Sequence, residues 1–231
     1  MIDIYIYKAE LDYLAENETA VLDKLSMWRR EKAEKIRNKN ARLISLAAGF
    51  MLQEVFLNEY DIDIREKAVS LGENGKPYLD GLKFNLSHSG NMIVLAVSDR
   101  EIGIDIECKG DEGFKVTKRF FVPEEIEYVK TEDDFRVIWT RKESFVKCLG
   151  KGMSIPFRSF SVIAKDAEGM DCAAVLNKEY YNDRAEEAES LGFLGFPVEE
   201  DGMKYQISLC ITKKSILEGY NIQYLGCIFR D

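Results

Sequence analysis

The chain has 231 residues, of which 46% are hydrophobic and 11% aromatic, enough to bury one sizeable core or two smaller packed halves. Lysine and arginine number 32 against 41 aspartate and glutamate residues, and the net charge of −9 argues against nucleic acid or an anionic membrane surface as partner. The start lacks the basic and apolar regions of a signal peptide, and no apolar run reaches membrane-spanning length, so we expect a cytoplasmic protein. The five cysteines form no CxxC pair, so we expect neither a disulfide framework nor a zinc site.

The first part of the chain combines a predicted strand with an unusually basic helical region. Residues 2–7 alternate as a strand does, and residues 18–36 read as helical. Within residues 24–42, eight basic and two acidic side chains give a local charge of +6 in an acidic protein. Arg29 and Lys32 fall on one helix face and form a candidate anion site. The alternative is a solvated helix face with salt bridges.

A long helix and a tight turn follow. Apolar residues recur at helical spacing over residues 40–58, which predicts an amphipathic helix with a core-facing stripe. Residues 67–71 read as a short strand, and the turn after them leads into Gly75-Lys76-Pro77. Because proline fixes its own φ and biases the preceding residue towards an extended conformation, this segment could present backbone amides and the Lys76 ammonium to a ligand.

The only histidine, His88, lies in the segment Ser87-His88-Ser89 between two predicted strands. Two hydroxyls and an imidazole can together donate several hydrogen bonds to a phosphate. A structural histidine bonded only to the backbone is the alternative. A serine hydrolase fits less well, since no Gly-x-Ser-x-Gly elbow surrounds either serine.

Residues 102–107 alternate between isoleucine and other residues, which predicts a strand with one apolar and one acidic face. The three isoleucines can enter a core while Asp105 and Glu107 stand side by side on the other face. Their mutual repulsion would be relieved by a hard divalent cation such as Mg²⁺, which prefers oxygen ligands. The alternative is an edge strand whose acidic face is solvated.

Two helices are predicted further along the chain. One has Glu125 in its first turn, where a carboxylate suits the helix dipole. The other covers residues 134–149, and on it Glu143 and Lys147 are neighbours along one face with Lys142 adjacent. Taken alone, this spacing is also that of an ordinary Glu–Lys pair on a helix surface.

The rest of the chain predicts antiparallel strands at residues 160–163, 173–176, 205–211 and 222–229. Between the second and third of these, residues 177–202 are acidic and carry an apolar stretch at 191–196. We expect this segment to be a surface excursion from the fold.

Four segments share, in order and spacing, the motifs of a known enzyme family. They are Gly75-Lys76-Pro77-Tyr78, Phe84-Asn85-Leu86-Ser87-His88-Ser89, Gly103-Ile104-Asp105-Ile106-Glu107 and Trp139-Thr140-Arg141-Lys142-Glu143-Ser144-Phe145-Val146-Lys147. In this combination, residues 29–160 resemble the 4′-phosphopantetheinyl transferases of the Sfp type. The resemblance implies a monomeric α/β fold of the α+β type, a pseudo-twofold pair of halves that each pack a small antiparallel sheet on a long helix. Residues 1–101 and 102–231 would be the halves, with coenzyme A in the cleft between them.

The resemblance also implies roles for individual residues. Mg²⁺ would be held by Asp105, Glu107 and Glu143. The catalytic residues would be Glu143, Lys147, His88 and Glu125, the last as a proposed base. Coenzyme A would be contacted by Arg29, Lys32, Arg42, Gly75, Lys76, Pro77, Ser87, His88, Lys142 and Lys147.

The implied reaction transfers the 4′-phosphopantetheine group of coenzyme A to a serine hydroxyl of an acyl or peptidyl carrier protein and releases 3′,5′-ADP with the help of Mg²⁺. Two other classes remain open. A metal-dependent phosphohydrolase of a nucleotide like coenzyme A would keep the carboxylates but need no protein acceptor. A non-catalytic protein that binds coenzyme A or a carrier would tolerate loss of Glu143.

Overall fold

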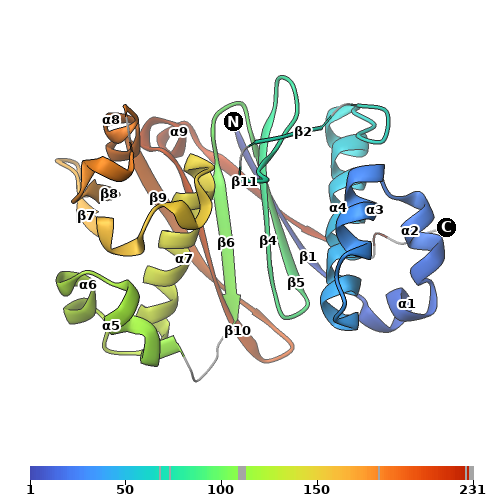
Figure 1. The fold of residues 1–231 in the computed structure, drawn as a ribbon, viewed down its shortest axis with the longest axis horizontal. Coiled ribbons are helices and arrows are strands. Elements are labelled where there is room, and N and C mark those ends of the chain that lie inside the picture. The colour runs from blue at the N-terminus through green and yellow to red at the C-terminus, as the bar shows by residue number, and fades with distance from the viewer. Residues whose placement is uncertain (68, 73, 109–112, 182, 227, 229–231) are drawn as a thin grey trace.

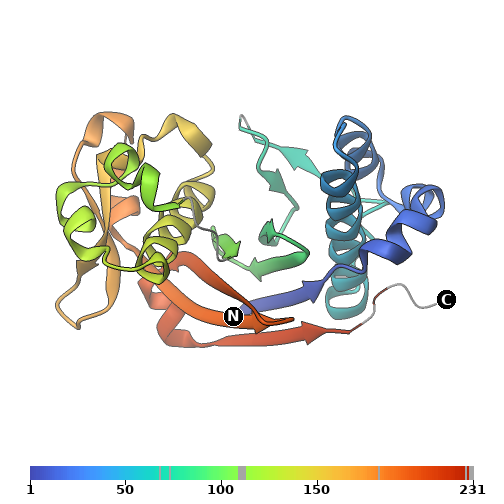
Figure 2. The ribbon, with the colours of Figure 1, turned by 90° about the horizontal axis from the view of Figure 1, so that it is seen from below.

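The computed structural model describes residues 1–67, 69–72, 74–108, 113–181, 183–226 and 228. Two β-sheets form the core of the molecule, and each packs against a long helix, α4 (Lys39–Tyr60) or α7 (Glu132–Leu149) (Figure 1). Figure 2 shows the two long helices on opposite sides of the central strands. This mixed architecture of antiparallel sheets and helices is the one expected from the sequence.

The N-terminal half is built on a four-stranded sheet with the strand order β11-β1-β5-β4. β1 pairs antiparallel with β5, and β5 pairs antiparallel with β4. β11 pairs parallel with β1, so the prediction that all late strands are antiparallel is wrong for this strand. The chain returns from the C-terminal half and joins the edge of the N-terminal sheet. The strands are β1 (Ile2–Lys8), β4 (Lys83–Ser89), β5 (Met92–Ser98) and β11 (Tyr220–Leu225).

Helix α4 buries its apolar stripe against this sheet, as its periodicity predicts. Its first turn is capped by Asn38, whose side chain accepts a hydrogen bond from the Ala41 amide. The predicted helix over residues 18–36 is divided at Ser26, whose amide donates to the Gln53 side chain of α4. The smaller helices of this half are α1 (Leu11–Glu16), α2 (Glu18–Lys24) and α3 (Met27–Glu34).

The C-terminal half is built on a five-stranded sheet with the strand order β6-β10-β9-β8-β7. Its strands are β6 (Gly103–Cys108), β7 (Phe160–Lys165), β8 (Asp171–Val175), β9 (Leu191–Glu200) and β10 (Met203–Thr212). The prediction of a surface excursion over residues 177–202 is wrong, because β9 pairs with β10 over its full length. The sequence did not predict this strand because it contains Gly192 and Pro197, and both residue types are rare in strands.

Shorter elements complete the fold. The remaining α-helices are α5 (Thr117–Phe120), α6 (Pro123–Tyr128), α8 (Ala185–Glu189) and α9 (Lys213–Glu218). A small hairpin pairs β2 (Ser70–Leu71) with β3 (Pro77–Tyr78). The 3-10 helices are η1 (Gly113–Val116), η2 (Gly152–Ser154), η3 (Phe157–Ser159) and η4 (Lys178–Tyr180). Among the described residues, no helix is both long enough and apolar enough to cross a membrane.

A third apolar core lies between the two sheets and joins the halves. It contains side chains of β1 and β5 from the N-terminal sheet and of β6 and β10 from the C-terminal sheet. The isoleucines at 102, 104 and 106 are at most 1% exposed, as the alternation of this strand predicts. The predicted boundary between the halves, at residues 101 and 102, stays a prediction. It falls in the connection between β5 and β6, but β11 crosses back to pair with β1 in the N-terminal sheet.

The second face of β6 is covered by α7 rather than by solvent. Gly103 lies where strand and helix approach most closely, since a Cβ atom there would stand 2.0 Å from the Ser144 carbonyl oxygen and 2.4 Å from the Cys148 amide nitrogen. Because alternate residues of a strand share a face, Asp105 and Glu107 also point towards α7. The alternative of a solvated acidic face is therefore wrong.

We predict that Gly103→Ala destabilises the protein by about 1–3 kcal/mol or more, because the added methyl group forces β6 away from α7. Gly226→Ala is the matched control, since a Cβ there meets nothing within 4 Å, and it should change stability by less than about 0.5 kcal/mol. Urea unfolding of both variants measures the difference. Equal stability of the two variants would contradict the close packing of strand on helix.

Candidate active site

The two halves meet along β4 and β6 through side-chain hydrogen bonds. Asn85 Oδ1 accepts from the Ile104 amide at 2.8 Å, and Ser87 Oγ donates to Asp105 Oδ1 at 2.7 Å. Asn85, Ser87 and Ser89 alternate along β4, so all three point towards β6. Short polar residues at every second position of residues 85–89 could have predicted this contact with β6. A contact between these side chains and β6 was not predicted from the sequence.

Asp105 is the centre of this contact. Its side chain accepts from Lys147 Nζ of α7 at 2.6 Å, and the same ammonium lies 3.0 Å from Ser87 Oγ. Asp105 is only 4% exposed, yet its second oxygen, Oδ2, is buried without a hydrogen-bond partner. A buried carboxylate oxygen without a partner is costly, and a bound cation would satisfy it.

Two more carboxylates share the field of Asp105. Burial raises the pKa of Glu107, and the charge of Asp105 raises it further, while Ser89 and Trp139 oppose the shift by hydrogen bonding. Burial likewise raises the pKa of Glu143, with Lys147 opposing and the other two carboxylates adding to the shift. Strand β6 and helix α7 thus hold three interacting carboxylates. The alternation of residues 102–107 predicted the pair on β6, and the family resemblance implied Glu143.

The chemistry of these three side chains fits a hard divalent cation. All three supply carboxylate oxygens, burial and the neighbouring carboxylates raise the pKa values of Glu107 and Glu143, and Asp105 Oδ2 has no partner. Within the described residues, no three potential ligands already converge into a metal site. In this structure, the ammonium of Lys147, bonded to Asp105, supplies the positive charge next to the three carboxylates.

Two neighbouring cavities lie near this cluster, a smaller one where Lys147 of α7 faces α3 and β4, and a larger one within the N-terminal half. The smaller has a volume of about 210 Å³ and is lined by Ser87, His88 and Lys147, among other residues. The larger, of about 560 Å³, is lined by residues that include Gly75 and Pro77. Both are bounded by Arg29 and Lys32 of α3.

Arg29 is a buried cation without an acidic partner among the described residues. It is 4% exposed, its Nη2 donates to the Ser45 carbonyl at 2.6 Å, and its Nε has no partner. Burial lowers the pKa of Arg29 to about 10, so the side chain stays charged at neutral pH. A desolvated guanidinium that borders a cavity favours an anion there.

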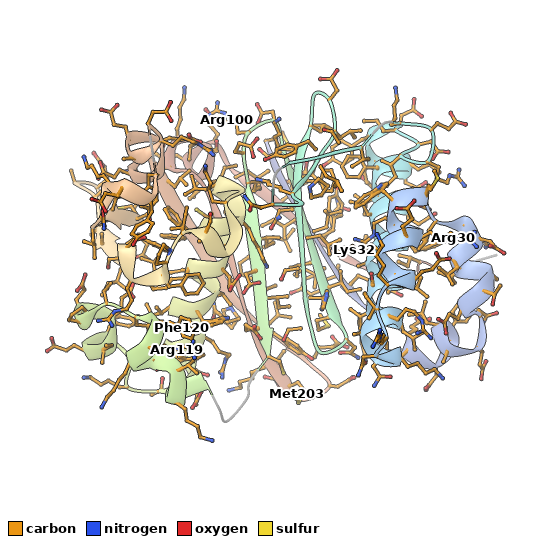
Figure 3. All side chains as sticks on the ribbon, viewed as in Figure 1. Arg30, Lys32, Arg100, Arg119, Phe120 and Met203 are labelled. Atoms are coloured by element: carbon orange, nitrogen blue, oxygen red, sulfur yellow. The ribbon has the colours of Figure 1, made fainter. Side chains whose placement is uncertain are left out.

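Lys32 and His88 extend this positive field across the cavity. Lys32 lies on the side of α3 that faces β4, and Arg30 lies on the far side (Figure 3). Burial lowers the pKa of His88, and the charges of Lys147, Lys32 and Arg29 lower it further. These shifts favour the neutral imidazole of His88, while the charge of Asp105 opposes them.

Two residues that the resemblance places near coenzyme A are engaged elsewhere. Lys76 Nζ donates to Glu101 at 2.7 Å and to the Cys148 carbonyl at 2.9 Å, so it ties the β2–β3 region to the end of α7. Arg42 forms an ion pair with Glu18, which raises the pKa of Arg42. Neither ammonium nor guanidinium lines the two cavities described above.

Glu125 and Lys142 form a buried ion pair away from the cavities. Both side chains are 0% exposed, and Lys142 Nζ lies 2.9 Å from Glu125 Oε2. Lys142 also donates to the carbonyls of Phe157 and Phe160, at 2.7 and 2.8 Å. Burial raises the pKa of Glu125 and lowers that of Lys142 to about 8. The structure therefore separates these two residues from the cluster, because their side chains are directed into the C-terminal core.

The proteins found to be similar to this chain share one family description. A family model described as the 4′-phosphopantetheinyl transferase superfamily matches residues 101–210. A 4′-phosphopantetheinyl transferase of Bacillus subtilis is 35% identical over 161 residues, which cover 66% of this chain and 72% of that protein. The 4′-phosphopantetheinyl transferase Sfp of Bacillus subtilis strain 168 is 34% identical over 147 residues, covering 60% and 66%. The 4′-phosphopantetheinyl transferase HetI of Nostoc is 35% identical over 121 residues, covering 48% and 50%.

The buried ion pair generates a prediction about stability. Lys142→Met should destabilise the protein by about 3–5 kcal/mol, because it leaves the Glu125 carboxylate buried without its cation. Adding Glu125→Gln to that variant should recover part of the loss, since it removes the buried charge and keeps an oxygen that accepts from the backbone amide of Val122 or Val162. Chemical unfolding of the single and double variants measures both effects. A double variant no more stable than the single one would contradict this account.

Proposed function

The chain belongs to the 4′-phosphopantetheinyl transferase superfamily, and from this premise we propose that it transfers the phosphopantetheine group of coenzyme A to a serine hydroxyl of an acyl or peptidyl carrier protein. The observation that carries the proposal is the meeting of a cationic cavity with a carboxylate cluster at the junction of the halves. The cavity suits a nucleotide phosphate, and the cluster suits a metal and a reacting pyrophosphate.

The donor would lie in the two neighbouring cavities described above, which share Arg29 and Lys32 in their linings. Arg29 and Lys32 would bind the 3′-phosphate, since both border the cavities and Arg29 is a buried cation without an acidic partner among the described residues. Gly75 and Pro77 would flank the nucleotide from the larger cavity. His88 would donate to the pyrophosphate from the smaller one.

Asp105, Glu107 and Glu143 would hold Mg²⁺, which when bound would neutralise negative charge on the pyrophosphate. Lys147 would then turn from Asp105 towards the same phosphates, because its ammonium already borders the smaller cavity. Its ammonium would then balance negative charge on the departing nucleotide. This role explains why an ammonium should stand beside three carboxylates in a protein that binds a polyanion.

In the proposed reaction, the acceptor serine oxygen forms a bond to the β-phosphorus, and the bond from that phosphorus to the bridging oxygen breaks. The serine proton passes to a carboxylate, and 3′,5′-ADP leaves with its charge balanced by Lys147. We assign the proton acceptor to Glu143 rather than Glu125. Glu143 belongs to the cluster, whereas Glu125 is bonded to Lys142 in the core.

The decisive experiment follows carrier mass and nucleotide release together. The protein is incubated with coenzyme A, Mg²⁺ and a panel of apo carrier proteins from fatty-acid, polyketide and peptide synthesis. A transferase yields equal amounts of phosphopantetheinylated carrier and 3′,5′-ADP, and a carrier with serine changed to alanine stops both. Nucleotide release without a carrier would instead indicate a phosphohydrolase. Binding without either product would indicate a non-catalytic protein.

We predict that Asp105→Asn and Glu143→Gln each lower the rate of transfer by about 100-fold or more, because the cluster loses one of its charged oxygens. The control is Asp99→Asn, which makes the same change of charge at an exposed side chain beyond β5. Rates at saturating Mg²⁺ and thermal unfolding of each variant are measured. Full activity of either cluster variant would refute the three-carboxylate site.

We predict that Arg29→Ala and Lys32→Ala each weaken binding of coenzyme A by about tenfold, while binding of 3′-dephospho-coenzyme A changes much less. The cause is the loss of a charge-assisted contact to the additional phosphate. Arg30→Ala is the matched control, since Arg30 pairs with Asp23 and Glu34 on the far side of α3. Calorimetric titration gives the affinities, and equal weakening for both ligands would place these cations elsewhere on the nucleotide.

A further inference from the structure

Lys76, between β2 and β3, is a buried lysine whose ammonium has three acceptors within the protein. The residue is 8% exposed, and its Nζ donates to Glu101 Oε2 at 2.7 Å, to the Ile102 carbonyl at 3.1 Å and to the Cys148 carbonyl at 2.9 Å. An ammonium has three N–H groups, so these acceptors leave none for a phosphate. The Lys76 side chain therefore has a role other than the contact with coenzyme A that the family resemblance implies.

The two carbonyl groups belong to the elements that carry the carboxylate cluster. Cys148 directly follows Lys147 on α7, and Ile102 directly precedes Gly103, the first residue of β6. Gly103 is also where these two elements approach most closely, since a Cβ atom there would stand 2.4 Å from the Cys148 amide nitrogen. One ammonium thus bonds the backbone of both elements at their closest contact, next to the lysine that is bonded to Asp105.

The rest of the β2–β3 hairpin also contacts the C-terminal end of α7. Asn74 Nδ2 donates to the Gly150 carbonyl at 3.1 Å. Gly150 ends the helix in a left-handed conformation, and a Cβ atom there would stand 3.0 Å from the Tyr78 hydroxyl oxygen. The final carbonyls of a helix lack partners within the helix and carry partial negative charge, so the Lys76 ammonium and the Asn74 amide are well suited to this position.

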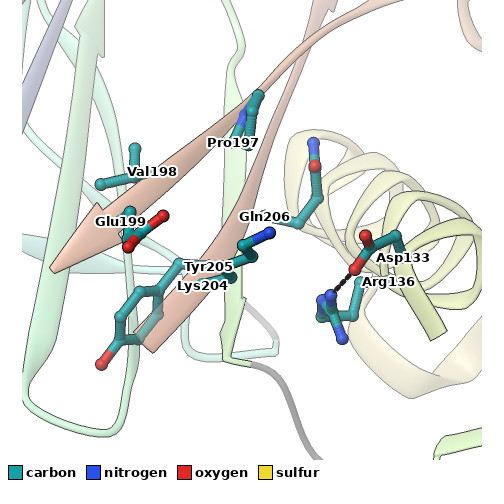
Figure 4. A pocket seen from close by; sticks show the side chains of 8 residues that line it. All are labelled: Asp133, Arg136, Pro197, Val198, Glu199, Lys204, Tyr205 and Gln206. Atoms are coloured by element: carbon teal, nitrogen blue, oxygen red, sulfur yellow. Dashed lines mark hydrogen bonds and ion pairs between the residues drawn. The ribbon is translucent and has the colours of Figure 1, made fainter. Parts of the chain in front are cut away.

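The N-terminal end of α7 is held by residues of its own segment. Thr131 and Asp134 form a capping box, and Arg136 pairs with Asp133 (Figure 4). A cavity of about 470 Å³ lies between this end and the β9–β10 hairpin, and its lining combines two cations with two anions, so its charges select no ligand. The end next to Lys147, in contrast, is bonded to the N-terminal half.

The β2–β3 hairpin also forms part of the wall of the larger cavity. Gly75 and Pro77, on either side of Lys76, line this cavity together with Asn74. A nucleotide in the cavity would therefore lie against the residues that flank Lys76. The Lys76 side chain extends from that wall to the backbone next to Lys147, so it connects the proposed nucleotide site with the carboxylate cluster.

We propose that Lys76 is a positioning residue, which sets the placement of Lys147 and the carboxylate cluster relative to the bound nucleotide. The inference rests on the proposed transfer reaction, in which Lys147 balances charge on the departing nucleotide. A displacement of about 1 Å can lower a rate by about 100-fold, even when the altered residue is remote from the chemistry. Loss of Lys76 should therefore act on the chemical step more than on binding of coenzyme A.

The test separates the chemical step from binding. Lys76→Met should lower kcat about 10- to 100-fold, while KM for coenzyme A and its affinity by calorimetric titration change by less than about twofold. Lys76→Arg, which keeps a cation with several donors, should restore part of kcat. Lys83→Met is the matched control, since Lys83 of β4 pairs with the same Glu101 carboxylate at 3.5 Å. It leaves the three bonds of Lys76 in place and should not change kcat.

A second measurement follows the connection directly and needs no carrier protein. Binding of 3′,5′-ADP to the unaltered protein should slow hydrogen exchange of the backbone amides of residues 146–151. In Lys76→Met this protection should be lost although the nucleotide still binds. Should Lys76→Met prove too unstable to assay, Asn74→Ala, at an exposed position, should still lower kcat several-fold and weaken the protection, because it removes the bond to the Gly150 carbonyl.

Three results would overturn the inference. If Lys76→Met weakens binding of coenzyme A about tenfold with kcat unchanged, the ammonium contacts the nucleotide directly. A parallel fall in kcat, affinity and the midpoint of thermal unfolding, without rescue by Lys76→Arg, would make the role of Lys76 purely structural. If the unaltered protein transfers phosphopantetheine and Lys76→Met transfers it at the same rate, this inference fails while the proposed function stands. Protection that depends on Lys76 in a protein without transfer activity would support the connection and refute the transfer reaction.

Discussion

The contact between Asp105, Ser87 and Lys147 is the constraint on which the rest of the site depends. It joins β4 of one half to β6 and α7 of the other through bonds of 2.6 to 3.0 Å. Side chains of β4 accept hydrogen bonds from backbone amides of β6, so these amides of the C-terminal half are satisfied by side chains of the other half. The carboxylate cluster is therefore fixed in relation to the cationic cavity by the same bonds that close the fold.

The distribution of charge explains how an acidic protein can offer a site for a polyanion. The net charge of −9 describes the long-range field, whereas binding depends on the few cations that border the cavity. Arg42 and Arg30 of the basic segment are neutralised by ion pairs with acidic residues. Arg29 is not, and Lys32 faces the same cavity. Ion pairs thus neutralise two of the eight basic side chains of this segment, whereas Arg29 and Lys32 remain as cations that border the cavity.

Much of the fold and part of the site could be predicted because local patterns determine them. The helical spacing of α4 and the alternation of β6 are properties of short segments, and both are confirmed. The pairing of β11 could not be predicted, because its parallel partner β1 lies at the other end of the chain. Lys142 was grouped with Glu143 through the family motif, yet consecutive helical residues point about 100° apart. One enters the core and the other faces the cluster.

The arrangement also explains why neither half could perform the proposed reaction alone. The carboxylates and Lys147 come from the C-terminal half, whereas Arg29, Lys32 and His88, which line the smaller cavity, come from the N-terminal half. Their relative position is maintained by the apolar core between the sheets and by β11, which returns from the C-terminal half to pair with β1. Separation of the halves would expose that core. The geometry of the site is therefore stabilised by burial of the apolar residues between the sheets, which are not themselves site residues.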